Sequence, residues 1–134
     1  MYRVAKYIDF CYGHRLLNYA GKCRHLHGHN GRVLIEIAGD HLDSRGMLAD
    51  FGDIKRIVKQ WIDDNIDHRM ILNRDDPALA FFRDSGEPHY VIDENPTAEA
   101  IARLIHDKAR QLGLPVTRVV LWETPDSCAE FGRR

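Results

Sequence analysis

Residues 23–38 read CRHLHGHNGRVLIEIA, and this stretch joins a cluster of histidines to an alternating segment. Beyond the histidines, Val33, Ile35 and Ile37 share one side of an extended chain, and the charged residues Arg32 and Glu36 lie on the other. Apolar side chains at every second position are typical of a strand that has one buried face. The pattern therefore predicts a central β-strand over residues 29–38, with the histidines at its start.

The neighbouring segments extend this strand into a sheet. Residues 2–11 (YRVAKYIDFC) are rich in aromatic and β-branched side chains and predict a first strand. Residues 12–28 contain three glycines and predict an irregular excursion between the two strands. After a polar turn, residues 47–51 are expected to form the returning strand of a hairpin. Residues 117–123 (TRVVLWE) predict a last strand.

Two segments have helical periodicity. Within residues 53–64, apolar side chains recur at the i, i+3, i+4, i+7 and i+8 positions of an amphipathic helix. Thr97 is a plausible N-cap for a second helix, which Gly113 and Pro115 end. The segment between them, residues 73–95, is expected to be a loop with one short ordered piece.

This order of elements predicts one α+β domain over residues 1–134. We expect a four-stranded antiparallel sheet with two helices packed on one face. The edges of so small a sheet are closed most easily by other subunits.

Composition excludes several classes of function. The formal net charge is −1 and no basic run is present, so no nucleic-acid partner is expected. No apolar run is long enough to span a membrane, and the first ten residues do not resemble a signal peptide. Three cysteines, an odd and low number, favour reduced thiols and a cytoplasmic protein.

The histidines indicate a metal site. His27 and His29 are two residues apart on an extended chain, so their side chains share a face about 6.5 Å apart. His27 and His29 lie on the same side of the extended chain as Val33, Ile35 and Ile37. His14, just beyond the first strand, becomes a third ligand if the two strands pair. Three histidines with an open fourth position are typical of catalytic Zn²⁺, whereas magnesium and calcium prefer oxygen ligands. We expect His41, His89 and His106 to be solvated.

Two further residues are informative. Cys23 lies four residues before His27, so it is either a fourth ligand or a thiolate base whose pKa is depressed by a nearby cation. Glu123 has the parity of buried residues in the last strand, where a carboxylate needs a partner. A ligand with two adjacent N–H donors would match it, unless the strand has already ended and Glu123 faces water.

Several motifs together resemble one family. They are the upstream His14, the Cys23-x-x-x-His27-Gly28-His29 stretch, the IDHRMILN and ENPTAE segments, and a Glu-Thr pair after the last strand. Across nearly the whole chain, this set is similar to the 6-pyruvoyltetrahydropterin synthase family, in particular its bacterial branch of 6-carboxytetrahydropterin synthases. HGH alone would be a weak signal, but the set is specific.

The resemblance implies a fold and a set of roles. It implies the tunnelling fold (T-fold), whose sheets close into barrels in trimers, and a homo-hexamer made of two trimers with sites between subunits. His14, His27 and His29 would hold zinc, and Cys23 would accept a proton. Asp67 and His68 would relay protons, although alone they could be a solvated pair at a helix end. Glu123 and Thr97 would contact the pterin, with Glu123 often grouped with the relay.

The implied activity is that of a zinc-dependent lyase acting on 7,8-dihydroneopterin triphosphate. The 6-carboxy branch yields 6-carboxytetrahydropterin, acetaldehyde and triphosphate for queuosine biosynthesis. Alternatives are a 6-pyruvoyltetrahydropterin synthase and a non-catalytic zinc- or pterin-binding protein. A branch with aldolase activity carries a glutamate near the cysteine position, so Cys23 counts against it. The chain departs from the family in Cys11-Tyr12-Gly13, where two small residues often precede the first zinc histidine, and in the long 73–94 segment.

Overall fold

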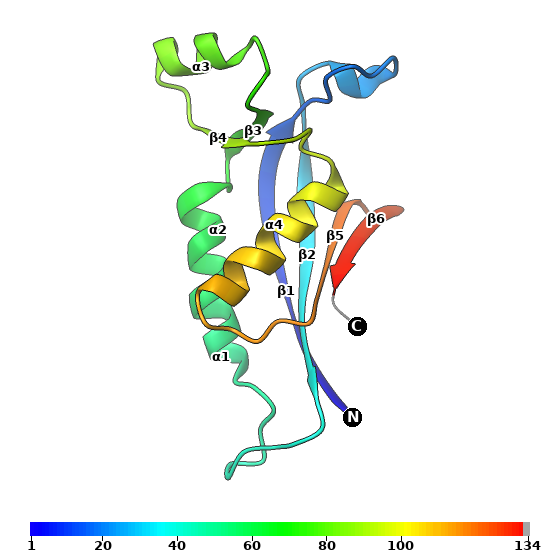
Figure 1. Cartoon of the computed structure of the whole chain (residues 1–134), viewed down its shortest axis with the longest axis vertical. Coiled ribbons are helices and arrows are strands. Elements are labelled where there is room, and N and C mark those ends of the chain that lie inside the picture. The colour runs from blue at the N-terminus through cyan, green and yellow to red at the C-terminus, as the bar shows by residue number, and fades with distance from the viewer. Residues whose placement is uncertain (133–134) are drawn as a thin grey trace.

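The computed structural model describes residues 1–132 and contains a single six-stranded sheet. The strand order is β4-β3-β1-β2-β5-β6. Figure 1 shows β1 and β2 running the length of the molecule, with the shorter strands on either side. The strands are β1 (Tyr2–His14), β2 (His27–Gly39), β3 (Arg69–Asn73), β4 (His89–Ile92), β5 (Arg118–Thr124) and β6 (Ser127–Gly132).

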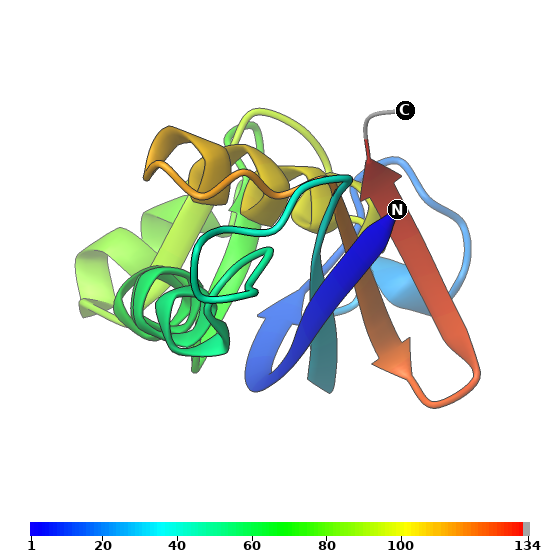
Figure 2. The same ribbon diagram turned by 90° about the horizontal axis from the view of Figure 1, so that it is seen from below.

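The helices lie mainly on one face of this sheet (Figures 1 and 2). A continuous helix consists of α1 (Phe51–Ile54), the π-helical η2 (Lys55–Lys59) and α2 (Gln60–Asn65). The others are the 3₁₀ turn η1 (Lys22–Arg24), α3 (Leu79–Ser85) and α4 (Ala98–Gln111). Of these three, α4 is the longest, with 14 residues. None of the helices in residues 1–132 has the length and hydrophobicity of a membrane span.

The core forms between the sheet and these two long helices. Along β1, β2 and β5, the residues of one parity are buried, and they pack against Ile54, Val58 and Ile62 of the first helix and Ile101 and Ile105 of α4. Apolar area removed from water stabilises the fold by about 25 cal/mol per Å². This packing requires the observed register, because a slip by one residue would expose the whole apolar face. The buried strand residues are Ile8, Phe10, Tyr12, Val33, Ile35, Ile37, Val119 and Leu121.

The predicted α+β class, with two helices on one face, is confirmed. The helix predicted over residues 53–64 and the strand predicted over residues 117–123 are present with small shifts of their ends. Thr97 is the N-cap of α4, and its hydroxyl accepts a hydrogen bond from the Ala100 amide at 3.1 Å.

The number and direction of the strands differ from the prediction. The sheet has six strands. The segment predicted as a loop, residues 73–95, starts at the last residue of β3 and contains α3 and β4. A further strand, β6, follows the last predicted strand. It is also mixed, because β3 runs parallel to β1 and β4 runs parallel to β3. The short strands β3 and β4 carry too few residues to reveal a periodic pattern.

The strand predicted over residues 47–51 is wrong. These residues form bends and the start of α1, where the Asp50 side chain accepts a hydrogen bond from the Gly52 amide at 2.7 Å and caps the helix. His106 was expected to be solvated, but it is fully buried on α4 and its ring packs edge-on against Phe131 of β6. The missed strand β6 is what covers this histidine.

A buried ion pair joins two segments that flank the end of β1. Arg15 follows His14 and donates two hydrogen bonds to the carboxylate of Asp76, whose side chain is fully buried. Asp76 also accepts a hydrogen bond from the Ala78 amide. The Arg15 guanidinium holds the pKa of Asp76 below its usual value, although burial opposes this effect.

We predict that Asp76→Asn lowers the free energy of unfolding at pH 7 by about 3 kcal/mol, because it leaves Arg15 without its charged partner. The depressed pKa of Asp76 means that this contribution is complete above the unfolded value of about 3.9 and is lost as the pH falls through the folded value. Urea denaturation of both proteins, at one protein concentration, should therefore show the difference shrinking toward pH 3. The exposed neighbour Asp75 provides the control, since Asp75→Asn should change stability by less than about 0.5 kcal/mol. A difference that stays constant with pH would contradict the ion-pair account.

Candidate metal centre

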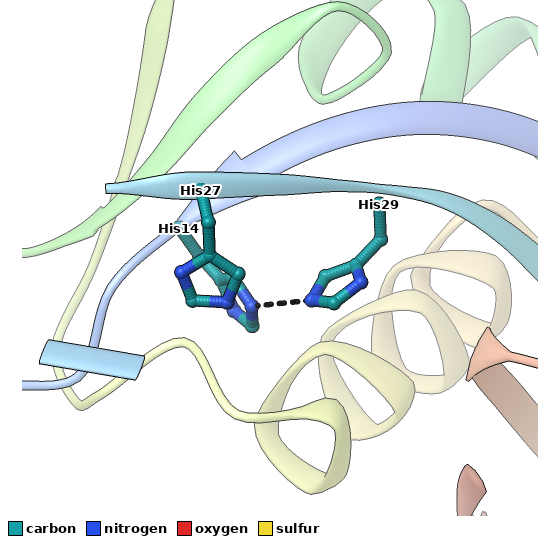
Figure 3. A group of neighbouring side chains, drawn as sticks. All are labelled: His14, His27 and His29. Carbon is teal, nitrogen blue, oxygen red and sulfur yellow. Dashed lines mark hydrogen bonds between the residues drawn. The ribbon is translucent and has the colours of Figure 1, made fainter. Parts of the chain in front are cut away.

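Three imidazoles converge at one end of the sheet (Figure 3). His14 ends β1, and it lies directly opposite His27 in the antiparallel register. His29 comes two residues later on β2, so all three rings project from the same face, the one that the helices cover. One nitrogen from each ring lies within 4.8 Å of the other two. This spacing suits a single ion bound about 2.0–2.1 Å from each nitrogen.

Hydrogen bonds to backbone carbonyls orient two of these rings. The Nδ1 atom of His14 lies 2.6 Å from the carbonyl oxygen of Pro96, and Nδ1 of His27 lies 2.7 Å from that of His25. A carbonyl oxygen only accepts, so each Nδ1 carries the hydrogen and each Nε2 presents a lone pair. Donation to a backbone carbonyl is the usual outer contact of a metal-binding histidine.

The Nε2 atoms are the ones left for an ion. Nε2 of His27 is buried without a hydrogen-bond partner, and Nε2 of His14 lies 3.1 Å from Nε2 of His29. Burial lowers the pKa of His14, which favours the neutral ring that a metal requires. The donor set fits a divalent metal that accepts imidazole nitrogens, such as zinc.

Cys23 is not part of this group of nitrogens. It lies in η1 within the excursion between β1 and β2, where it is partly exposed. Its carbonyl accepts a hydrogen bond from the Leu16 amide at 2.8 Å, which ties the two sides of the excursion together. Within residues 1–132, the side chains that could share one ion at this place are therefore the three histidines, without a thiol.

Glu123 lies beside the histidines, on the face expected from its parity. Its two carboxylate oxygens are 3.8 Å from Nε2 of His14 and 3.9 Å from Nε2 of His29. The side chain is about one quarter exposed, so it borders both the buried centre and solvent. A carboxylate in this place can accept hydrogen bonds from a bound ligand, or it can itself approach an ion.

Tyr12 completes the wall of the centre and was not predicted as a site residue. Its ring is 3% exposed and lies edge-on to the ring of His14, with the centroids 5.2 Å apart. Burial, followed by the negative charge of Glu123, raises the pKa of its phenol well above the ordinary value. In the sequence, Tyr12 was marked only by lying in the Cys11-Tyr12-Gly13 stretch, where the family often has small residues before the first zinc histidine.

Asp67 and His68 are in direct contact. Nδ1 of His68 lies 3.0 Å from one Asp67 oxygen, and the other oxygen accepts a hydrogen bond from the Cys11 amide at 3.0 Å. Burial alone would raise the pKa of Asp67, but these two hydrogen bonds outweigh it and the pKa is lowered. The backbone of His68 is left-handed, with φ of 57°, and its amide donates to the Cys11 carbonyl. The ring itself is 78% exposed.

This pair faces away from the metal centre. It lines a pocket of about 820 Å³ together with Asp9, Cys11 and Trp122, whose side chains have the opposite parity to the buried strand residues. The pocket therefore lies on the face of the sheet that the two long helices leave uncovered. Within one chain, the structure brings His14, His27, His29 and Glu123 together but leaves Asp67 and His68 outside that group.

The ENPT segment supports the centre from the helix side. Pro96 supplies the carbonyl for His14, and Thr97 uses its hydroxyl to cap α4. Asn95 holds the start of the excursion, because its amide group both accepts from the Leu17 amide and donates to the Leu17 carbonyl. Sequence reasoning missed the roles of Asn95 and Pro96, since a backbone carbonyl and a loop amide leave no periodic signal.

Comparison with known proteins agrees with this geometry. Residues 3–134 match the family model described as 6-pyruvoyl tetrahydropterin synthase. A protein of Rickettsia conorii named 6-carboxy-5,6,7,8-tetrahydropterin synthase is 36% identical, over 97% of this chain and 99% of the relative. A protein of the same name from Haemophilus influenzae is 33% identical over 98% of this chain and 99% of its own.

Solved structures give the same result for the fold. An uncharacterized protein from Wolinella succinogenes superposes with a TM-score of 0.81 at 31% identity, covering 99% of this chain and 98% of the other. The 6-pyruvoyl tetrahydropterin synthase of Caenorhabditis elegans superposes with a TM-score of 0.74, at 22% identity over 99% and 96% of the two chains, and shows the fold alone. By its sequence and its T-fold architecture, the chain belongs to the 6-pyruvoyl tetrahydropterin synthase family.

Proposed function

We propose that this protein is a zinc-dependent lyase that converts 7,8-dihydroneopterin triphosphate and water to 6-carboxy-5,6,7,8-tetrahydropterin, acetaldehyde and triphosphate. The observation that carries the proposal is the group of three Nε2 atoms with an open position and the Glu123 carboxylate beside it. The names of the Rickettsia conorii and Haemophilus influenzae relatives support this product. In this function the protein acts in the cytoplasm and supplies the queuosine pathway.

The chain's own residues divide the chemistry. His14, His27 and His29 would hold a zinc ion, which would supply Lewis acidity toward hydroxyl groups on the side chain of the substrate. Glu123 accepts two N–H hydrogen bonds from the pterin ring and so orients it, and Thr97 lies at the ring's edge. Cys23 takes a proton from the substrate as thiolate. His68, held by Asp67, returns a proton to the substrate.

The separation of the two groups supports an assembly of several copies. The pair Asp67–His68 lines the uncovered face of the sheet, whereas the histidine centre lies on the helix-covered face. One chain thus holds halves of two different sites, and a neighbouring copy must supply the second half of each. We propose a homo-hexamer, made of two trimers, with its active sites between subunits.

A second candidate is 6-pyruvoyltetrahydropterin synthase, which would use the same residues on the same substrate but keep the side chain as a diketone. The family model carries this name, and so does the Caenorhabditis elegans structure. The relatives above 30% identity that bear a functional name favour the 6-carboxy product. A protein that only binds zinc or a pterin would form no product at all.

For the metal, we predict about one zinc per chain in the purified protein and a loss of at least tenfold in zinc affinity for His27→Ala. Mass spectrometry of metals and a competitive chelator titration measure both quantities. His89→Ala is a matched control, because Nδ1 of His89 also bonds the carbonyl two residues earlier but lies outside the metal group. Equal zinc content in the wild type and in His27→Ala would contradict the assignment.

For the reaction, purified zinc-loaded protein should convert 7,8-dihydroneopterin triphosphate to 6-carboxytetrahydropterin and acetaldehyde, as detected by mass spectrometry. Cys23→Ala should reduce turnover by about 10²-fold or more while zinc remains bound, since it removes the base and no ligand. Cys128→Ala, at an exposed thiol, should leave turnover unchanged. Loss of zinc from Cys23→Ala would make Cys23 a ligand, and a 6-pyruvoyl product would select the second candidate.

For the assembly, His14→Ala and His68→Ala should each be inactive alone but recover activity when co-expressed and co-purified. If each site takes its two halves from different subunits, a site is intact when the histidine half comes from the His68→Ala chain and the Asp67–His68 half from the His14→Ala chain. Random mixing of equal amounts of the two chains therefore restores about a quarter of the sites. Activity of tagged, co-purified mixtures measures this recovery. If each site lay within one chain, the mixture would stay as inactive as the single variants.

A further inference from the structure

The hydroxyl of Tyr12 is buried, and no atom of residues 1–132 stands in hydrogen-bond geometry with it in the structure. The ring is held between Phe10, on which it stacks at 5.3 Å, and the imidazoles of His14 and His29, at 5.2 and 5.7 Å. A phenol without a partner costs free energy on burial, so a core tyrosine normally has its hydroxyl satisfied. Phenylalanine would fill the same space without this cost.

Gly31 makes room for this ring. Tyr12 pairs with His29 across β1 and β2, and Gly31 follows two residues later on the same face. A Cβ atom at Gly31 would lie 2.9 Å from Cε1 of Tyr12, closer than packed atoms approach. The missing side chain allows the ring to lean across β2 toward β5. Arg32, next to Gly31, pairs with Trp122, next to Glu123, so Gly31 and Glu123 both lie just beyond the last paired position of β2 and β5.

The Glu123 carboxylate has two competing uses. Its oxygens lie 3.8 and 3.9 Å from the Nε2 atoms that would hold zinc, so a small movement would make it a fourth ligand and close the site. As a pterin anchor, it must instead keep both oxygens free for N–H donors. A hydrogen-bond donor on the other side of the carboxylate would decide between these uses. Tyr12 packs against the same two imidazoles, with its ring centroid 5.2 Å from that of His14 and 5.7 Å from that of His29, so its phenol is the buried donor nearest to hand for this carboxylate.

We propose that the Tyr12 hydroxyl donates a hydrogen bond to the Glu123 carboxylate and holds it off the metal, oriented for the pterin ring. This inference rests on the proposed function for the identity of the ligand. Tyr12 is a positioning residue in this account, because it acts through Glu123 and touches no reacting atom. The hydrogen bond also satisfies the only polar atom of the Tyr12 side chain.

A double-mutant cycle tests the proposal with two readouts other than turnover. The proteins are wild type, Tyr12→Phe, Glu123→Gln and the double variant, with Tyr90→Phe as a control for removing a phenol outside the site. The first readout is the affinity for 6-carboxypterin, measured by calorimetry on zinc-loaded protein. The second is the visible d–d absorption of cobalt-substituted protein, which reports the number and kind of metal ligands.

We expect Tyr12→Phe to weaken 6-carboxypterin binding about tenfold, the effect of losing one hydrogen bond to a charged group. The double variant should bind no more weakly than Glu123→Gln alone, since the phenol acts through that carboxylate. The cobalt spectrum should change in Tyr12→Phe, as Glu123 joins the metal, and return toward the wild-type spectrum in the double variant. Gly31→Ala, which displaces the ring, should shift both readouts in the same direction as Tyr12→Phe.

Two results would overturn the proposal. One is unchanged pterin affinity and an unchanged cobalt spectrum in Tyr12→Phe, which would make the residue a packing element. The other is a loss of affinity that adds to that of Glu123→Gln, which would mean that Tyr12 acts independently. If the wild type binds no pterin and forms no product, the proposed function fails, but the cobalt spectra still decide whether Tyr12 controls Glu123.

Discussion

The antiparallel pairing of β1 with β2 is the constraint on which the rest of this structure depends. The register runs from Tyr2 opposite Gly39 to His14 opposite His27, so the strand pair is long and continuous. A shift by one residue would move all of its buried side chains to the other face of the sheet. The same alternation that puts Ile8 and Val33 into the core continues to the end of the pair and delivers the histidines to the covered face. Metal centre and core are therefore consequences of one register.

Loops far apart in sequence complete what the register begins. The excursion after His14 is held by the buried carboxylate of Asp76 and by the amide of Asn95, both from the segment around β3, α3 and β4. The carbonyl of Pro96 then sets the tautomer of His14. Each contact satisfies polar groups of a partly or fully buried segment, so the surroundings of the three imidazoles have a defined geometry.

Sequence reasoning succeeded where a pattern repeats and failed where a contact is unique. The alternation of β2 and the helical period after Phe51 gave the class of fold, and parity placed His27, His29 and Glu123 on one face. The strands β3, β4 and β6 are short or at an edge, so their pairing depends on neighbours that no local pattern reveals. For the same reason the burial of His106 under β6 was not predicted. Tyr12 was noted only because it differs from the small residues that often precede the first zinc histidine.

The positions of the two groups on opposite faces of one sheet have a consequence for heterozygous or mixed populations of the protein. Under the proposed arrangement, each subunit contributes His14, His27 and His29 to one site and Asp67 with His68 to another. A chain that folds but has lost both halves would disable two sites in every assembly that it joins, and so would act as a dominant inhibitor. A chain that fails to fold would remove only itself.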